Sequence, residues 1–185
     1  MGKTILLVDD EVEITDIHQR YLVQAGYQVL VAHDGVEALE IFKRKAIDLI
    51  ITDIEMPNMD GIALSREAMK INPHIKIILI SAYDKFEYAR QAVRLGACDY
   101  IEKPVDYIFL YDKIKDAFEI IDREQRNLSI LKESKQLMTA RFFQDLLYFP
   151  PDKLSENFEK YVKYLELKTD YSHFNIIKLE IENST

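Results

Sequence analysis

The chain has 185 residues, of which 48% are hydrophobic, and it carries 24 Lys and Arg against 32 Asp and Glu. That apolar share supports a packed core and excludes a wholly disordered chain. The length predicts one domain, or one domain and a piece of another. The net charge of −8 argues against a nucleic-acid interface spread over the whole surface.

Cysteine, histidine and glycine usage narrows the class of protein further. The single cysteine, Cys98, cannot form an internal disulfide, which predicts a cytoplasmic protein in a reducing compartment. The longest apolar run, Tyr107–Tyr111, is far shorter than the ~20 residues of a membrane helix, so no membrane contact is expected. The five glycines are too far apart for a phosphate-binding loop. The four scattered histidines, His18 among them, are expected to be solvated or half-buried.

Short apolar runs alternate with amphipathic stretches through the first hundred residues. The apolar runs predict strands at Thr4–Val8, Gln28–Ala32, Leu49–Thr52, Ile75–Ile80 and Asp99–Glu102. The amphipathic stretches predict helices at Glu13–Ala25, from the N-cap Asp34 to about Lys45, from the loop at Met56–Gly61 to about Ile71, and at Lys85–Leu95.

Two local patterns support the first two helices. The first helix has apolar residues at helical spacing, at Ile14, Ile17, Tyr21 and Leu22. The second begins with Asp34 followed three residues later by Glu37, which is the arrangement of a capping box. Helices that alternate with strands in this way predict an α/β fold, with a doubly wound five-stranded parallel sheet and helices on both faces.

The pattern changes after the fifth expected strand. Apolar residues then recur at three-four spacing, which predicts one long helix, or two in line, over about Tyr107–Tyr148, ended by Pro150-Pro151. The first part of this helix must cover the sheet. From Leu128 onward two interpretations stay open: a helix packed on its own protein, or a dimerising coiled coil weakened by Glu124 and Lys135 at seam positions.

Beyond the long helix the sequence predicts only part of another domain. A helix-like stretch at Lys153–Leu165 and a strand-like run at Phe174–Ile181 are together too short to fold alone. We therefore expect one domain over residues 1–122, a helical linker over 123–149, and the start of an incomplete second domain over 150–185.

Five chemically reactive side chains fall where the expected strands finish. Asp9 and Asp10 follow the first strand, Asp53 the third, Ser81 the fourth and Lys103 the fifth. In a doubly wound sheet the functional crevice lies beyond the carboxyl ends of the strands, so all five are expected in one crevice. Clustered carboxylates repel one another unless a cation or protons are bound, and oxygen-only ligands favour Mg²⁺.

The expected Mg²⁺ site combines carboxylates with a backbone oxygen. Asp10 and Asp53 are expected to bind the metal directly and Asp9 through water. The backbone carbonyl of Glu55 supplies a further oxygen in this arrangement.

Asp53 is the expected nucleophile toward a phosphoryl group, because it lies between the acidic pair and Lys103. Mg²⁺ and Lys103 would neutralise the charge on the transferring oxygens, and Ser81 would hydrogen-bond one of them. Asp60 is a rival acceptor by proximity, but its Asp-Gly context favours a turn.

Four segments taken together resemble the receiver domain of two-component response regulators, over residues 4 to about 122. They are Leu6–Glu11, Thr52–Gly61, Ser81-Ala82 and Asp99–Pro104. The resemblance implies that a sensor histidine kinase carries the phosphoryl group on a histidine and that Asp53 accepts it.

The resemblance also implies a conformational switch. Ser81 stands where the family often has Thr, so the hydroxyl is kept, and Ser81 and Tyr100 are the expected switch residues. The Lys103-Pro104 peptide bond is expected to be cis. A homodimer favoured by phosphorylation is expected, through the face of the fourth helix that carries Phe86 and Tyr88, through the long helix, or through both.

A narrower resemblance concerns the output of the protein. The segments Ser81–Ala89 and Arg141–Leu147 look like the response-regulator subgroup with AraC-type DNA-binding output. That subgroup carries two C-terminal helix-turn-helix units, which this sequence lacks, and residues 106–185 hold 12 Lys and Arg against 15 Asp and Glu. We therefore expect the N-terminal portion of a longer transcription regulator that contacts DNA only through a domain absent from this chain.

Three other classes compete with a non-enzymatic signalling switch. A naturally short relay protein would explain the receiver motifs, but it explains residues 150–185 poorly. A Mg²⁺-dependent phosphatase of the haloacid dehalogenase type would place Asp-x-Asp after the first strand, where this chain has Asp9-Asp10-Glu11. A DNA-binding module in its own right is disfavoured by the acidic balance.

Overall fold

The computed structural model describes residues 2–82, 86–97, 99–148, 160–161 and 163–165. Cys98, most of the helix expected at Lys153–Leu165 and the strand expected at Phe174–Ile181 lie outside these residues. The chain divides into two compact units, Met1–Asp122 and Arg123–Thr185. Within the described residues, no helix combines the length and the apolarity needed to cross a membrane.

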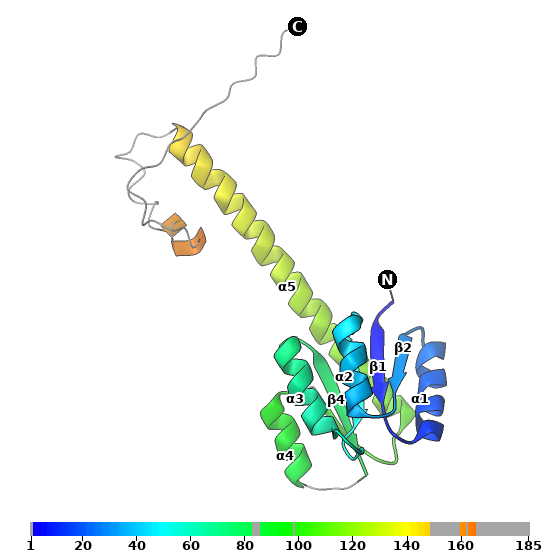
Figure 1. The fold of residues 1–185 in the computed structure, drawn as a ribbon. Helices are drawn as coiled ribbons and strands as arrows, with labels where there is room; N and C mark the ends of the chain where they lie inside the picture. The colour runs from blue at the N-terminus through cyan, green and yellow to red at the C-terminus, as the bar shows by residue number, and fades with distance from the viewer. Residues whose placement is uncertain (1, 83–85, 98, 149–159, 162, 166–185) are drawn as a thin grey trace. The chain divides into compact units, whose positions relative to one another are not determined.

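A five-stranded parallel sheet forms the centre of the first unit (Figure 1). Its strands run in the order β2-β1-β3-β4-β5. They are β1 (Thr4–Val8), β2 (Gln28–Ala32), β3 (Leu49–Asp53), β4 (Lys76–Ser81) and β5 (Asp99–Glu102). The strand order reverses direction beside β1, as the predicted doubly wound fold requires, so that prediction is confirmed.

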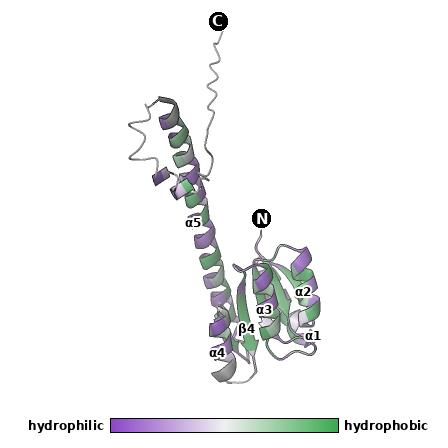
Figure 2. Ribbon diagram, turned by 60° about the vertical axis from the view of Figure 1, so that its left-hand side comes forward, coloured by the Kyte–Doolittle hydropathy of each residue, from purple (hydrophilic) through white to green (hydrophobic). Residues whose placement is uncertain are grey.

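Helices cover both faces of the sheet and enclose two hydrophobic clusters. The helices are α1 (Val12–Gln24), α2 (Gly35–Arg44), α3 (Gly61–Ile71), α4 (Phe86–Leu95) and α5 (Tyr107–Tyr148). One cluster joins the sheet to α2, α3 and α4 through residues such as Phe42, Leu64 and Ala92. The other joins it to α1 and α5 through Leu22 and Leu110. Figure 2 shows the result, with hydrophobic strands inside and helices that alternate hydrophobic and hydrophilic residues.

Two strands end one residue later than the sequence predicts. Asp53 belongs to β3 because it pairs in register with Ile80, and Ser81 belongs to β4 because it pairs with Glu102. Both residues are buried, since neighbouring strands continue alongside them. The reactive side chains at these positions are thus held by sheet rather than by loop.

Side-chain caps define where two of the helices begin. The Asp34 carboxylate accepts a hydrogen bond from the backbone N–H of Glu37 at 2.8 Å, as predicted for the start of α2. The Glu37 carboxylate reaches back to the N–H of His33 at 2.9 Å. Asp60, expected in a turn, caps α3 by accepting from the N–H of Ala63.

The buried face of α1 differs from the one its apolar spacing suggests. Ile17 is 53% exposed, whereas Thr15, His18 and Leu22 are buried. The expectation of a solvated or half-buried His18 is therefore wrong. His18 is buried because of a contact with a distant part of the chain. Its ring packs edge-on against the ring of Tyr107 from the start of α5, with centroids 5.6 Å apart.

Helix α5 is one continuous helix, and the division between the two units falls within it. In the first unit its residues Leu110 and Ile114 are fully buried against the sheet, as predicted. In the second unit Phe142 packs with Tyr161 and Leu165, and these three residues form a small separate cluster.

Candidate functional site

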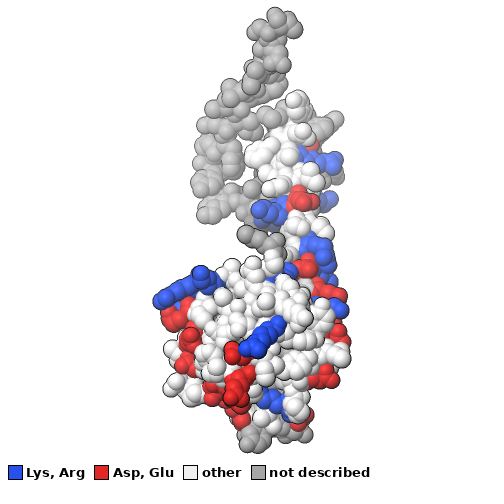
Figure 3. Space-filling model, turned by 90° about the vertical axis from the view of Figure 1, so that its right-hand side faces the viewer, with Lys and Arg blue, Asp and Glu red and all other residues white. Residues whose placement is uncertain are grey.

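Three carboxylates meet at the carboxyl ends of β1 and β3. Oxygen atoms of Asp9, Asp10 and Asp53 all lie within 4.8 Å of one another. Asp9 and Asp53 are buried and Asp10 is exposed, so the cluster opens to solvent on one side. Acidic side chains gather toward the lower end of the first unit in Figure 3, which is the end where the strands of Figure 1 finish.

Lys103, which follows β5, places its ammonium group among these carboxylates. Its Nζ atom lies 3.1 Å from Oδ2 of Asp9 and 3.2 Å from Oδ2 of Asp53. A third oxygen, from Glu11, lies 3.5 Å away. Glu11 was not among the site residues predicted from the sequence, although its position directly after Asp9 and Asp10 pointed to the crevice.

The backbone fixes the direction of both buried carboxylates. Oδ1 of Asp9 accepts a hydrogen bond from the N–H of Glu11, and Oδ1 of Asp53 accepts one from the N–H of Ile54, each at 2.9 Å. In each side chain this leaves Oδ2 facing Lys103. Both carboxylates are therefore preorganised before any ligand arrives.

Burial and charge shift two pKa values in the cluster. Burial raises the pKa of Asp53, the nearby charge of Lys103 lowers it in part, and the charge of Asp9 raises it further. Burial alone would lower the pKa of Lys103, but the hydrogen bond to Asp9 and the charges of both carboxylates raise it above its ordinary value. Lys103 is therefore an ammonium at neutral pH.

The raised pKa of Asp53 predicts that its charge costs stability when no metal is bound. The folded chain holds the Asp53 proton more tightly than the unfolded chain, so stability falls as pH rises from the ordinary pKa of 3.8 through the raised one. Asp53→Asn removes this deficit, and we expect it to raise the free energy of unfolding by on the order of 1 kcal/mol at neutral pH. Urea denaturation in chelator measures the gain, which should shrink as pH falls toward 3.8. An equal gain at all pH values would contradict this origin.

Gly61, predicted from the sequence only as part of a turn, lies against the backbone that carries Asp53. A Cβ atom at Gly61 would lie 2.2 Å from the Asp53 carbonyl oxygen and 3.1 Å from Cα of Ile54. The N–H of Gly61 also donates to the carbonyl of Ile54 at 3.0 Å. Close approach of α3 to the end of β3 therefore requires a residue without a side chain.

Replacing Gly61 with Ala should displace the end of β3. We expect Gly61→Ala to lower the free energy of unfolding by about 1–3 kcal/mol, because backbone atoms must move to admit the methyl group. Gly2→Ala is the matched control, since its Cβ would meet nothing closer than 3.8 Å. Urea denaturation of both variants tests this, and equal stability of the two would show that β3 accommodates the methyl group.

The remaining predicted site residues lie on or directly after strands β3, β4 and β5. Ser81 is fully buried at the end of β4, and its carbonyl accepts a hydrogen bond from the N–H of Lys103 at 2.7 Å. Tyr100 is half-buried on β5. It packs against the hydrophobic cluster that joins the sheet to α2, α3 and α4. Glu55 is half-buried two residues after Asp53, and its carboxylate is not one of the three grouped oxygens. The Lys103-Pro104 peptide bond is cis.

A cavity of about 420 Å³ lies beside Lys103, between α1 and the start of α5. Ile14, Ile17, His18 and Pro104 are among the residues that line it. Within the described part of the chain, Nδ1 of His18 is buried without a hydrogen-bond partner. Burial lowers the pKa of His18, so its ring is neutral at neutral pH.

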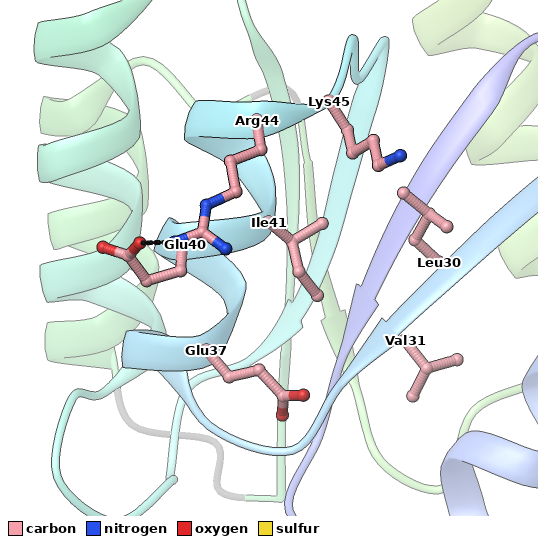
Figure 4. Close-up of a pocket in the computed structure, with 7 residues that line it drawn as sticks. All are labelled: Leu30, Val31, Glu37, Glu40, Ile41, Arg44 and Lys45. Atoms are coloured by element: carbon pink, nitrogen blue, oxygen red, sulfur yellow. Dashed lines mark hydrogen bonds and ion pairs between the residues drawn. The ribbon is translucent and has the colours of Figure 1, made fainter.

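A second cavity of similar volume, drawn in Figure 4, lies between α2 and the edge strand β2. Leu30 and Ile41 form its apolar part. Three of its four charged residues, all but Lys45, form contacts with one another or with the backbone: Glu40 pairs with Arg44 at 3.3 Å, and Glu37 accepts a hydrogen bond from the backbone N–H of His33. No clustered reactive group faces this cavity, and we assign it no function.

Comparison with known families decides what kind of domain this is. The response regulator receiver domain matches residues 5–115. The chain belongs to this family. The match runs from Ile5 in β1 to the first turns of α5, and so contains the whole carboxylate cluster.

Two curated relatives are similar to this chain over about two thirds of its length. The transcriptional regulatory protein ZraR of Escherichia coli O157:H7 is 38% identical over 123 residues, which are 65% of this chain and 28% of that protein. The sporulation initiation phosphotransferase F of Bacillus subtilis is 32% identical over 117 residues, covering 63% of this chain and 91% of that protein. The chain thus spans little more than a quarter of the length of the first of these relatives.

Solved structures agree with the receiver fold. A CheY-like receiver domain from Methanospirillum hungatei matches with a TM-score of 0.65 and 33% identity, covering 67% of this chain and 99% of that one. The response regulator TrrA of Thermotoga maritima, solved in complex with Mg²⁺ and BeF, matches with a TM-score of 0.58 and 35% identity over 62% of this chain and 98% of that one.

The donor set of the receiver cluster fits a hard divalent cation. All three grouped side chains offer carboxylate oxygens, within 4.8 Å of one another, and no sulfur or nitrogen ligand is in the group. Mg²⁺ is held in proteins by one or two carboxylates and several waters, which the open side at Asp10 admits. The residues present therefore suit Mg²⁺ better than Zn²⁺ or a softer metal.

Proposed function

We propose that this chain is the phosphoacceptor part of a two-component response regulator, in which Asp53 takes a phosphoryl group from the phosphohistidine of a sensor histidine kinase. The observation that carries the proposal is the fixed Asp53 carboxylate, grouped with Asp9 and Asp10 and 3.2 Å from the Lys103 ammonium. The bond from phosphorus to the imidazole nitrogen breaks, a bond to Oδ of Asp53 forms, and the nitrogen keeps the electron pair.

We assign Mg²⁺ to the same crevice. Asp10 and Asp53 would hold the ion directly, Asp9 through water, and the backbone carbonyl of Glu55 would supply another oxygen. When bound, Mg²⁺ supplies positive charge to the oxygens of the transferring group. The all-oxygen donor set supports this assignment, as does the presence of Mg²⁺ in the TrrA complex.

In this proposal Lys103 couples phosphorylation of Asp53 to a conformational change in the rest of the domain. Its ammonium sits on a long flexible stem and can leave Asp9 and Asp53 for a new anion. Its backbone N–H is bonded to the carbonyl of Ser81, so movement at the end of β5 is coupled to the end of β4. Ser81 then hydrogen-bonds a phosphoryl oxygen, and Tyr100 on β5 turns into the space that Ser81 leaves.

The sensor kinase is proposed to dock on the rim formed by α1 and the start of α5. The kinase histidine must come within bonding distance of Asp53, so its surroundings must contact the residues that border the crevice. Val12 and Ile17 on this rim are 54% and 53% exposed, which gives the partner an apolar surface. The cavity beside Lys103 adds a recess to the same rim.

The output of the switch is proposed to be transcription, through an AraC-type DNA-binding domain encoded outside this chain. The name of ZraR supports transcriptional control in general, and the AraC subgroup rests on the sequence motifs at 81–89 and 141–147. In this proposal residues 1–122 are the receiver, 123–149 a helical linker, and 150–185 the start of a second domain. The protein acts as a homodimer and is not an enzyme.

A stand-alone relay is the second candidate function. The sporulation initiation phosphotransferase F, of which this chain covers 91%, is a protein of about receiver length. The coding sequence beyond Thr185 separates the two candidates. A helix-turn-helix pair encoded there supports the transcription regulator, and a stop codon directly after Thr185 supports the relay.

Phosphoryl transfer itself is tested with a small phosphodonor. Incubation of the 185-residue chain with acetyl phosphate and Mg²⁺ should add one phosphoryl group per chain by intact mass. The added group should be labile to alkali, as an acyl phosphate is, and should not form when a chelator removes the metal. Continuous release of inorganic phosphate without a labelled intermediate would instead indicate an enzyme.

A further inference from the structure

The Asp53 carboxylate has a hydrogen-bond donor on each of its two oxygens. Oδ1 accepts from the backbone N–H of Ile54 at 2.9 Å, and Oδ2 accepts from the Lys103 ammonium at 3.2 Å. An oxygen held by a cation is less available for attack on phosphorus. Because the N–H of Ile54 is fixed by the backbone, Lys103 is the donor that can move. Asp53 therefore becomes a better nucleophile when the ammonium withdraws from Oδ2.

Of the three carboxylates around Lys103, Glu11 is the one that faces solvent. Its side chain is 60% exposed, whereas those of Asp9 and Asp53 are 2% and 7% exposed. The Nζ atom of Lys103 lies 3.5 Å from Oε1 of Glu11, so the two charges already interact. A phosphodonor enters the crevice from solvent. Movement of the ammonium from Asp53 toward Glu11 is therefore also movement toward the incoming phosphoryl oxygens.

Glu11 occupies the N-cap position of α1 without capping the helix. Its backbone angles, φ −80° and ψ 97°, are extended as an N-cap requires, but its side chain accepts no hydrogen bond from the first turn. In the same domain, α2 and α3 are capped by the carboxylates of Asp34 and Asp60. The additional methylene of Glu11 instead carries its carboxylate toward Lys103. A residue that is unfavourable locally and contacts a reactive group indicates a function.

We propose that Glu11 is a positioning residue for phosphoryl transfer, which draws the Lys103 ammonium away from Asp53 and toward the solvent-facing side of the crevice. The inference rests on the function proposed above and deepens it. The ammonium exchanges one carboxylate partner for another, so it stays paired while Oδ2 of Asp53 becomes available. Glu11 acts only through Lys103 and makes no contact with the phosphoryl group.

Glu11→Asp tests this role without a change in net charge. The side chain becomes shorter by about 1.5 Å, which takes the carboxylate out of reach of Lys103 and brings it to the N–H groups of the first turn. We expect a higher midpoint of urea denaturation, and labelling by acetyl phosphate that is about two- to fivefold slower, the range of an exposed ion pair. A merely structural role would move stability and labelling in the same direction.

The labelling reaction is followed by intact mass at several times after acetyl phosphate and Mg²⁺ are added. In each turnover the bond from phosphorus to the acetyl oxygen breaks, a bond to Oδ of Asp53 forms, and acetate leaves with the electron pair. The urea midpoints are measured separately in chelator, so that they report on the chain alone.

Glu13→Asp is the matched control. Glu13 is an exposed carboxylate in the first turn of α1, whereas the ion pairs of Lys103 are with Asp9, Glu11 and Asp53. The control also shortens an acidic side chain by one methylene at constant charge, and it should label at the wild-type rate. Equal slowing by Glu13→Asp would assign the effect to the start of α1 as a whole and would overturn the proposal.

A double-mutant cycle shows whether Glu11 acts through Lys103. Glu11→Gln is made in the wild-type chain and in Lys103→Met, and the urea midpoint of each variant is measured in chelator. The fall in midpoint caused by Glu11→Gln should be larger when Lys103 is present, because only then is an ion pair lost. Equal falls in the two backgrounds would show that the two side chains are not coupled, and the positioning role would be wrong.

The two kinds of measurement separate failure of this proposal from failure of the proposed function. A wild-type chain that accepts no phosphoryl group refutes the function, whereas the urea cycle still reports on the pairing of Glu11 with Lys103. If the wild type is labelled and Glu11→Asp is labelled as fast or faster, the function stands and the positioning role of Glu11 is wrong.

Discussion

Asp53→Asn should abolish phosphorylation of the chain by acetyl phosphate. The amide nitrogen and oxygen of Asn are not nucleophilic enough to displace the phosphoryl group, whereas Asn retains the size of Asp and can still accept the hydrogen bond from Ile54. Intact-mass measurement after incubation with Mg²⁺ should show only unmodified protein, with a loss of labelling of at least about 1,000-fold.

Asp60→Asn is the matched control for this experiment. Asp60 is an acidic residue seven positions away that caps α3, and Asn is as good an N-cap as Asp. This variant should label as the wild type does. Full labelling of Asp53→Asn, or loss of labelling in Asp60→Asn, would move the acceptor away from Asp53.

Asp10→Ala should weaken Mg²⁺ binding by at least about 10–100-fold, because it removes a carboxylate expected to touch the metal. Asp10 is exposed and forms no part of the core, so the fold should survive the change. Titration calorimetry measures the affinity, and a higher Mg²⁺ concentration should recover part of the lost phosphorylation. Both results follow from loss of a ligand rather than loss of the acceptor.

Asp16→Ala provides the comparison for charge alone. Asp16 is an exposed carboxylate on α1 outside the cluster, so this variant loses the same charge without losing a ligand. Its Mg²⁺ affinity should equal that of the wild type. If Asp10→Ala binds Mg²⁺ as tightly as Asp16→Ala does, the ion does not contact Asp10.

The local sequence determined the elements of this fold and the position of its crevice. Five apolar runs separated by helical periodicity are sufficient to predict a parallel sheet, because crossovers have one hand and reactive residues gather at carboxyl ends. The approach of Asp9, Asp10 and Asp53 to one another followed from that rule. The N-cap at Asp34 was readable as well, since a cap depends on residues within one turn.

Which side chains of α1 are buried, and why Gly61 must be a glycine, depend on tertiary contacts that the local sequence pattern does not show. Apolar spacing predicted that Ile17 belongs to the inner face of α1, but the ring of Tyr107 from α5 packs on His18 and leaves Ile17 exposed. Likewise, nothing near Gly61 in the sequence indicates that its hydrogen atom faces the carbonyl of Asp53. Both outcomes depend on residues far away along the chain.

The residue types and their spacing are thus enough to predict the side chains of the crevice, whereas the way these side chains are held depends on the fold. Lys103 is 50 positions from Asp53, yet its ammonium lies 3.2 Å from that carboxylate because β4 and β5 carry it there. On α5, the spacing of Glu124 and Lys135 in the sequence already places both on one face of the helix. The exposure of Leu128 on that face, in contrast, depends on what the folded chain packs against it. Periodicity is a property of neighbouring residues, whereas burial is a property of whatever packs against them.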